Sequence, residues 1–467
     1  MVNLSFNPFD ADLAQLETKH LSVLRDVAEG WYVEYKREVV ASKRIAKSLA
    51  AFANHYGGWL FYGIEQSKDG RNQAGSFLGI DKMSVTQCIE NIRNAAKDSI
   101  HPSPYFDYKV LEGPCTEINL PEDKSIIVIA IPTGPDAPYV HSDGRIYRRV
   151  ADASDPRPET DRFILDHLWQ RRQQAHDKLK TLLSQRPMLS KAESERSLIQ
   201  LFLFIDPLGA TGQHIDLTFA EFREVMSGVQ SPEEGLGIAF DNFFTMSDGL
   251  VCRQVGFYDP FDLLFTWRYY SDASAIVSLP VSSAWIPELS QSGLRDKTFL
   301  GRYEYGQQAL ELLQRHRHTT PHILDINGMY YAIAAILCQY HRLVAASRVR
   351  GQIYAKALLQ NLWRKIPFLD TAAYIRYVEE NGFPLIQSDE EFAPPGNTFD
   401  SLQIMTPLDR RSPGGVDEFL EALPLLQRIA NAVGLPVGVA LDPDFAWVSA
   451  AGRAVRISQT RSSHLGT

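Results

Sequence analysis

Two carboxylates near the start of the chain have the spacing that phosphodiester chemistry needs. Glu29 and Glu34 lie five positions apart, and Lys36 follows the second one closely. Farther on, an apolar segment ends in a third carboxylate, Glu65. Clustered carboxylates can hold a divalent ion that activates water, while neighbouring cations hold a polyanion. Nucleic acid is therefore the first substrate class that this sequence indicates.

The strand predicted around these residues leaves a second interpretation open. Gly30–Arg37 is rich in aromatic and β-branched residues, and side chains on a strand alternate between its faces. Glu34 and Lys36 then share a face, and Glu29 reaches that face only if Gly30 bends the chain. The alternative is a surface ion pair between Glu34 and Lys36, with Glu29 in solvent.

The next segment, 36–47, predicts a basic amphipathic helix. Lys43 and Lys47 are four residues apart, on the side opposite Ile45 and Leu49, and Glu38 is the one acid of the segment. This face is either a phosphate-binding surface or an ordinary solvated helix face. Its candidate nucleic-acid-binding residues are Arg37, Lys43, Arg44 and Lys47.

A second basic group lies on a strand-like segment farther along the chain. Arg145, Arg148 and Arg149 flank Tyr147 there. Guanidinium groups pair with phosphates and an aromatic ring stacks on a base, so the group suits contact with RNA. The alternative is an edge strand that its charges keep from pairing with another chain.

The composition limits the class of protein. The 467 residues suggest two or three domains, and 45% hydrophobic with 22% charged residues is ordinary for a soluble globular chain. A net charge of −9 excludes a protein that coats nucleic acid along its length, so any binding must use a local patch. Four scattered cysteines without a CxxC pair predict no zinc site and fit the reducing cytoplasm.

Two further patterns are missing from the sequence. It contains no GxxxxGK[ST] loop, so we expect no nucleotide cofactor. It also shows neither a signal-peptide pattern nor an apolar run long enough for a membrane span, so we expect a cytoplasmic protein without membrane contact.

The order of predicted elements divides the chain into four parts. Residues 1–155 alternate strands and helices as one mixed α/β domain, and 156–190 form a helical connector. Residues 191–455 are a mixed, mainly helical region, which includes a predicted helix at Arg350–Lys365, and 456–467 form a disordered tail.

Three blocks in the first part resemble the AlbA-type core domain of the Schlafen family. They are E-x4-E-Y-K at Glu29–Lys36, A-F-A-N-x-x-G-G-x-L-x-x-G-I at Ala51–Ile64, and I-Y-R-R-V at Ile146–Val150. The blocks cover about residues 20–170. The resemblance implies a mixed α+β Schlafen core and carries nothing over to the rest of the chain.

The resemblance also implies roles for the acidic residues. Active members of the family cut transfer and ribosomal RNA with three carboxylates, which correspond to Glu29, Glu34 and a position at Glu65 or Gln66. In that scheme the three glutamates hold Mg²⁺ or Mn²⁺ and Lys36 steadies the phosphate. This chain has Glu65-Gln66 where active members carry two aspartates, so either Glu65 completes the triad or a neutral Gln66 weakens it.

The resemblance therefore supports two functions. One is a divalent-metal-dependent endoribonuclease that cleaves structured RNA, transfer RNA first, as a defence or stress effector. The other is a non-catalytic nucleic-acid-binding regulator that uses the same surface. Animal Schlafen cores are similar to a two-lobed pincer, whereas this chain carries the central block once, so we expect a homodimer. The C-terminal region is expected to bind a protein or ligand partner.

Overall fold

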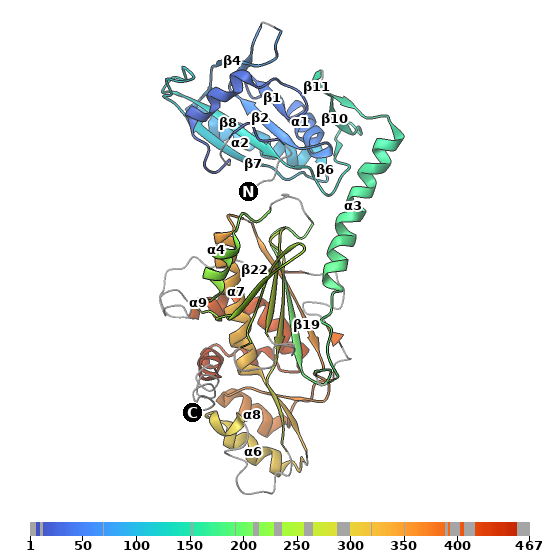
Figure 1. Ribbon diagram of the computed structural model, residues 1–467, viewed down its shortest axis with the longest axis vertical. Helices are drawn as coiled ribbons and strands as arrows, with labels where there is room; N and C mark the ends of the chain where they lie inside the picture. Colours follow the sequence, from blue (N-terminus) through green and yellow to red (C-terminus); the bar gives the residue numbers. More distant parts are fainter. Residues whose placement is uncertain are drawn as a thin grey trace. The chain divides into compact units, whose positions relative to one another are not determined.

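The structure is a computed structural model that divides into two compact units, and each unit is described by itself (Figure 1). The N-terminal unit comprises residues 1–182 and 206–214, and the C-terminal unit comprises 183–205 and 215–467. Both contain helices and sheets, which confirms the mixed α+β class. The residues described are 6–9, 13–68, 70–150, 153–191, 193–208, 214–227, 236–255, 265–286, 299–318, 320–349, 351–387, 391–392, 402–405 and 416–454.

The N-terminal unit is built on a five-stranded mixed sheet. Its first two strands, β1 and β2, run parallel with Glu34 opposite Leu60, and helix α1 makes the crossover that a parallel pair requires. The central strand β8 pairs antiparallel with β2, β5 and β7. The bounds are β1 Val33–Lys36, α1 Ser42–Asn54, β2 Gly58–Tyr62, β5 Ile80–Asp81, β7 Asp107–Glu112 and β8 Lys124–Ile131.

Both faces of this sheet are covered, which explains why β2 and β8 are apolar along their length. Helices α1 and α2 (Val85–Ser99) pack on one face, against Leu60 and Ile129. The 3₁₀ helix η1 (Thr18–Asp26) and the residues before it pack on the other face, against Phe61. Every residue of β2 is buried.

The central block of the resemblance is architectural, as its sequence predicts. Gly57 and Gly58 both have positive φ, and a Cβ on Gly58 would lie 2.4 Å from the carbonyl oxygen of Tyr32. Asn54 is buried and joins two distant segments, donating from Nδ2 to the carbonyls of Tyr139 and Tyr147 at 2.9 and 3.0 Å. The block therefore fixes the end of α1 against the chain around residue 147.

Shorter elements complete the N-terminal unit. The hairpin β10–β11 lies against α1, and helix α3 follows it. The remaining bounds are β3 Ile64–Gln66, β4 Ala74–Phe77, η2 Lys82–Ser84, β6 Ile100–His101, β9 Val140–His141, β10 Tyr147–Val150, β11 Ala153–Pro158 and α3 Arg162–Leu183.

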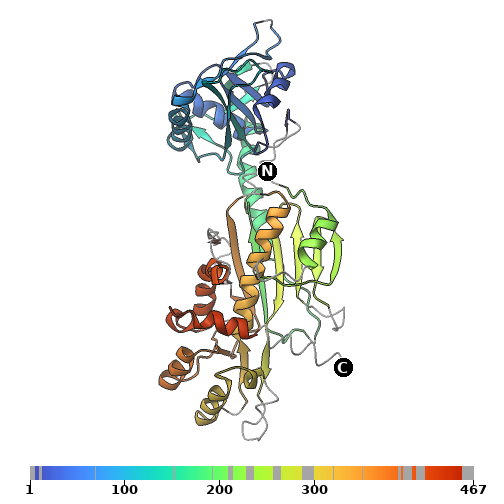
Figure 2. The same cartoon turned by 90° about the vertical axis from the view of Figure 1, so that its left-hand side faces the viewer.

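The C-terminal unit is centred on an eight-stranded antiparallel sheet in the order β13-β14-β15-β16-β12-β19-β21, with β22 also paired to β19. Helices α4, α7 and α9 pack on one face, against Ile199 and Leu201 of β12 (Figure 2). The bounds are β12 Leu198–Phe204, α4 Phe219–Ser227, β13 Asn242–Met246, β14 Gly249–Arg253, β15 Thr266–Tyr270, β16 Ala275–Pro280, α7 Ile326–Ala346, β19 Ile353–Gln360, β21 Glu391–Phe392, β22 Gln403–Met405 and α9 Val416–Ala432.

A smaller three-stranded sheet, β17-β18-β20, adjoins further helices of this unit. Its strands are β17 Ser283–Trp285, β18 His322–Asp325 and β20 Ile366–Phe368, and the helices are η4 Phe299–Arg302, α6 Gly306–Arg315, α8 Ala372–Asn381 and α10 Val437–Ala440. No helix of the described residues is both long and apolar enough to cross a membrane.

Two sequence predictions of local structure were wrong. Within the segment Arg350–Lys365, which was predicted to be a helix, Ile353–Gln360 form strand β19 because they pair with β12. The basic helix predicted over 36–47 begins only at Ser42, so Lys36 ends β1 and Arg37 lies in the turn that follows. The tail predicted to be disordered lies outside the described residues.

Candidate functional site

Glu34 lies at the centre of the predicted site, and its carboxylate is fully buried. Its Oε1 accepts from Ser48 Oγ at 2.9 Å and lies 2.8 Å from Lys36 Nζ. Its Oε2 accepts from Arg149 Nη1 at 2.8 Å. Both oxygens of this carboxylate are therefore held by donors of the protein itself.

Arg149 is the main counter-ion of Glu34, and it too has no exposed surface. The guanidinium also donates to the carbonyls of Gly30 and Val33, and it lies over the ring of Phe52 at 5.0 Å. These contacts hold it in one orientation inside the unit. Arg149 was predicted to bind nucleic acid, but in this position it faces the protein interior, so we leave it out of the binding surface.

Glu29 lies close enough to Glu34 for the two charges to repel one another. Its side chain is 9% exposed, and its Oε1 is buried without a hydrogen-bond partner. The pKa of Glu29 is raised to about 7, chiefly by burial and also by the charge of Glu34, against the opposing effects of Lys36, Arg149 and a backbone hydrogen bond from Tyr35. The bend at Gly30 thus brings Glu29 to the same region as Glu34, as one of the sequence interpretations requires.

Glu65 lies on β3 and pairs with a different residue. Its carboxylate is 3.7 Å from Arg37 Nη1, and both side chains are partly exposed. Gln66 follows it on the same strand. The structure shows no contact of Glu65 with Glu29 or Glu34 among the described residues.

These carboxylates do not fit a divalent metal ion as they are arranged. Within the described part of the chain, no three His, Cys, Asp or Glu side chains gather as a possible metal site. Glu34 directs both oxygens to Arg149, Lys36 and Ser48, so both are already held by donors of the protein. No chemical step is therefore derived through Mg²⁺ or Mn²⁺.

The exposed cations gather at the first turn of α1. Lys43 and Arg44 are exposed there, while Lys47 is half-buried with its Nζ 5.0 Å from the centre of the Tyr147 ring. The N-cap residue of the helix, Ala41, provides no side-chain cap, and the first turn contains no acid. The carbonyl of Lys43 contacts His141 Nε2 at 3.1 Å, which places β9 beside this turn.

The residues of the second basic group differ in exposure, because side chains alternate between the two faces of β10. Arg145 is exposed, whereas Arg148 is half-exposed and paired with Glu159. Tyr147 is buried, and its hydroxyl donates to Asp143 at 2.6 Å, so its ring is closed to a nucleobase. Arg145 and Arg148 are thus the members of this group that reach solvent.

The comparison with protein families concerns this same unit. Residues 29–158 match the family model described as Schlafen, AlbA_2. This segment is a Schlafen domain. The match confirms the resemblance of the three sequence blocks and indicates a nucleic-acid-related function for the N-terminal unit. The comparison with curated proteins found no match.

A solved structure similar to part of the chain is the DIP2311 protein from Corynebacterium diphtheriae, at 15% identity. The match covers 36% of this chain and 26% of that chain, with a TM-score of 0.19. The coverage is partial for both proteins, and a TM-score this low supports no argument about fold or function.

Sequence reasoning missed three residues that shape the Schlafen domain. Ser48 stands among the apolar positions of α1, and a polar residue there is a signal for a buried partner, which is Glu34. Glu159 pairs with Arg148, and Asp143 accepts a hydrogen bond from the Tyr147 hydroxyl. The Arg148–Glu159 pair depends on the hairpin β10–β11, so the position of Glu159 in the sequence gave no such signal.

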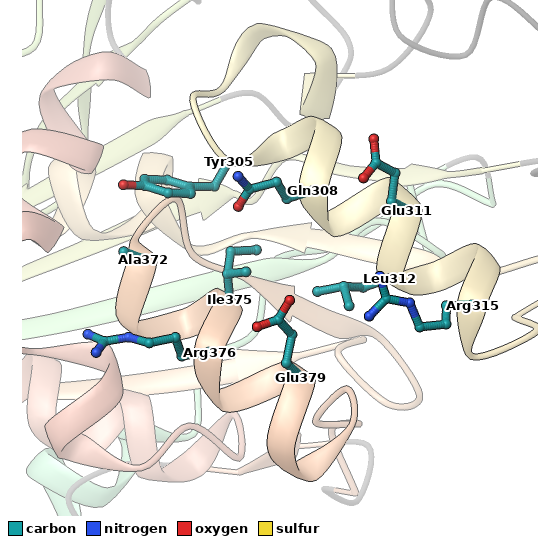
Figure 3. A pocket seen from close by; sticks show the side chains of 9 residues that line it. All are labelled: Tyr305, Gln308, Glu311, Leu312, Arg315, Ala372, Ile375, Arg376 and Glu379. Atoms are coloured by element: carbon teal, nitrogen blue, oxygen red, sulfur yellow. The ribbon is translucent and has the colours of Figure 1, made fainter.

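The C-terminal unit contains a separate cavity of about 370 Å³ between α6 and α8. Leu312 and Ile375 lie between the two helices, with charged side chains around them (Figure 3). Two of these are acidic and two are basic, so the cavity has no preference for a polyanion. The charged residues are Glu311, Arg315, Arg376 and Glu379.

Proposed function

We propose that this protein binds RNA through the Schlafen domain, with the first turn of α1 as the main phosphate contact. The observation that carries the proposal is the pair Lys43 and Arg44 on a helix start without a cap. Free backbone N–H groups and the helix dipole make a helix start favourable for anions, and cations placed there oppose the dipole. Two exposed cations at this position are unfavourable for the helix alone and favourable once a phosphate is bound.

The experiment is RNA binding by a charge-reversed variant across a range of salt concentrations. Lys43→Glu with Arg44→Glu should weaken binding to every RNA alike. The slope of log affinity against log salt should become shallower by roughly 0.7 for each phosphate that no longer pairs with a cation. The matched control is Lys97→Glu with Lys180→Glu, which makes the same charge change at exposed positions on α2 and α3. Equal effects in the two variants would show that net charge, rather than this turn, governs binding.

A second candidate function is RNA cleavage, and Glu29 is the observation that favours it. A buried carboxyl group with a free oxygen and a pKa near 7 has the properties of a general acid or base. Incubation with total RNA, transfer RNA included, tests this in the presence of Mn²⁺ and in the presence of a chelator. Fragments of defined size that persist with chelator and vanish in Glu29→Gln would support cleavage by Glu29. Fragments that require Mn²⁺ would support the three-carboxylate mechanism, and intact RNA in both would leave binding alone.

A further inference from the structure

A group of aromatic rings lies at the end of α1 opposite the cationic turn. Trp31 stacks on His55 with ring centres 4.8 Å apart, and it lies 5.9 Å from Tyr56. Tyr32 lies 6.0 Å from Tyr56 on the other side. Tyr56 is 48% exposed, while Trp31, Tyr32 and His55 are half-buried. The rings therefore present aromatic surface to solvent.

The backbone fixes these rings in place. Tyr32 leads into β1, and its carbonyl accepts from Trp59 N at 2.7 Å, directly beyond the two glycines. Gly58 approaches the same carbonyl so closely that a side chain is excluded. The segments that carry the rings are thus joined before any ligand arrives, which lowers the entropy cost of binding.

The surroundings of the rings favour an anionic ligand. The pKa of His55 is lowered to about 4, chiefly by burial and also by the charges of Arg148 and Arg171, against an opposing effect of Glu159. His55 is therefore a neutral ring at physiological pH. Its neighbours repel positive charge, which disfavours the trimethylammonium ligands that aromatic cages bind.

We propose that Trp31 and Tyr56 form a stacking surface for unpaired bases of the same RNA that Lys43 and Arg44 bind. The inference rests on the proposed RNA binding and adds that the ligand is single-stranded at this end. Helix α1 has 13 residues and is about 20 Å long, so the two ends span several nucleotides. A continuous duplex presents the edges of its bases and not their faces, so it leaves the rings unused.

The test compares single-stranded oligouridine with a duplex RNA of equal length, using the full chain. Tyr56→Ala should lower affinity for oligouridine roughly ten-fold, which is the typical effect of removing the ring under one stacked base, and change duplex binding less than two-fold. The salt dependence should stay as in the parent protein, because the Tyr56 side chain carries no charge that could pair with a phosphate. Tyr56→Phe should bind as the parent does, and thermal unfolding checks that each variant is folded.

Three outcomes overturn the inference. Undiminished binding of oligouridine by folded Tyr56→Ala rules out the stacking interaction while leaving the cationic turn in place. Full binding by Tyr56→Leu would show general apolar contact instead of stacking. A parent protein that binds neither RNA overturns the proposed function as well, and the two failures are thereby distinguished.

Discussion

Inside the Schlafen domain, Arg149, Lys36 and Ser48 surround the carboxylate of Glu34 with donors. A buried charge that loses its partner is far more costly than one exposed to water. The predicted catalytic carboxylate is thus also part of the structure. A loss of activity on changing Glu34 would say little about catalysis unless the fold is measured at the same time.

Removal of Arg149 tests how much its ion pair with Glu34 stabilises the fold. Arg149→Met should lower the free energy of unfolding by roughly 3–5 kcal/mol, since it removes the main counter-ion of the buried Glu34 and leaves Lys36 as its cationic partner. Urea unfolding measures this decrease, and Arg145→Met is the control because Arg145 is exposed. The double variant with Glu34→Gln should recover much of the stability. A decrease as small as that of the control would mean that the pair contributes nothing.

Glu29 predicts a pH dependence of stability. Its pKa is about 7 in the folded chain and near 4.5 without the fold, so the folded state holds a proton more firmly between these values. Its burial therefore costs stability as pH rises from about 4.5 through 7, by roughly 3 kcal/mol at most. Glu29→Gln should match the parent protein near pH 4.5 and be more stable at pH 8. A constant difference across this range, measured by unfolding at each pH, would contradict the shift.

At the scale of elements, α1 combines a buried length that packs in the core with an exposed, cationic first turn. Its buried face carries Ile45, Leu49 and Phe52 into the core, while its first turn exposes Lys43 and Arg44. The sign of the first-turn charges is unfavourable for the helix. Stability and RNA binding should therefore oppose one another at this helix start.

Ala41→Asp makes that opposition measurable. An aspartate at the cap position should stabilise the chain by about 1 kcal/mol, because it accepts from free N–H groups and its charge matches the dipole. The same carboxylate should weaken RNA binding by repelling phosphates. Ala41→Ser supplies the cap without the charge, so it separates the two effects. Thermal unfolding and RNA affinity are measured on the same samples of both variants. A stabilised Ala41→Asp variant with unchanged RNA affinity would place the phosphate contact elsewhere.

At the scale of the whole molecule, assembly is the open prediction. The Schlafen domain occurs once, and its exposed cationic turn is a small surface for a structured RNA. Two copies related by a two-fold axis would double that surface. The apolar residues of α7 are used in the core of their own unit.

We expect a dimer whose interface buries at least about 1,000 Å². Light scattering at micromolar concentration, with and without RNA, measures the mass in solution. A monomer in both conditions would exclude the paired arrangement. A dimer that appears only with RNA would instead show that the ligand joins the copies.

The sequence by itself determined the parts of this protein that depend on local pattern. Continuous apolar residues mark β2 and β8, and helical spacing marks the buried face of α1. The Gly57-Gly58 pair marks the turn from α1 into β2. Each of these depends on neighbours within a few residues, so the chain order is enough to predict it.

Only the tertiary structure decided which charges are free. Arg148 and Arg149 are adjacent in sequence, yet β10 turns one toward solvent and the other toward Glu34, 115 positions earlier. The segment Arg350–Lys365 has a helical pattern and becomes strand β19 because β12 pairs with it. Pairing across such distances depends on partners that no local window contains. For that reason the sequence suggested a group of three carboxylates but gave no sign of the guanidinium that holds Glu34.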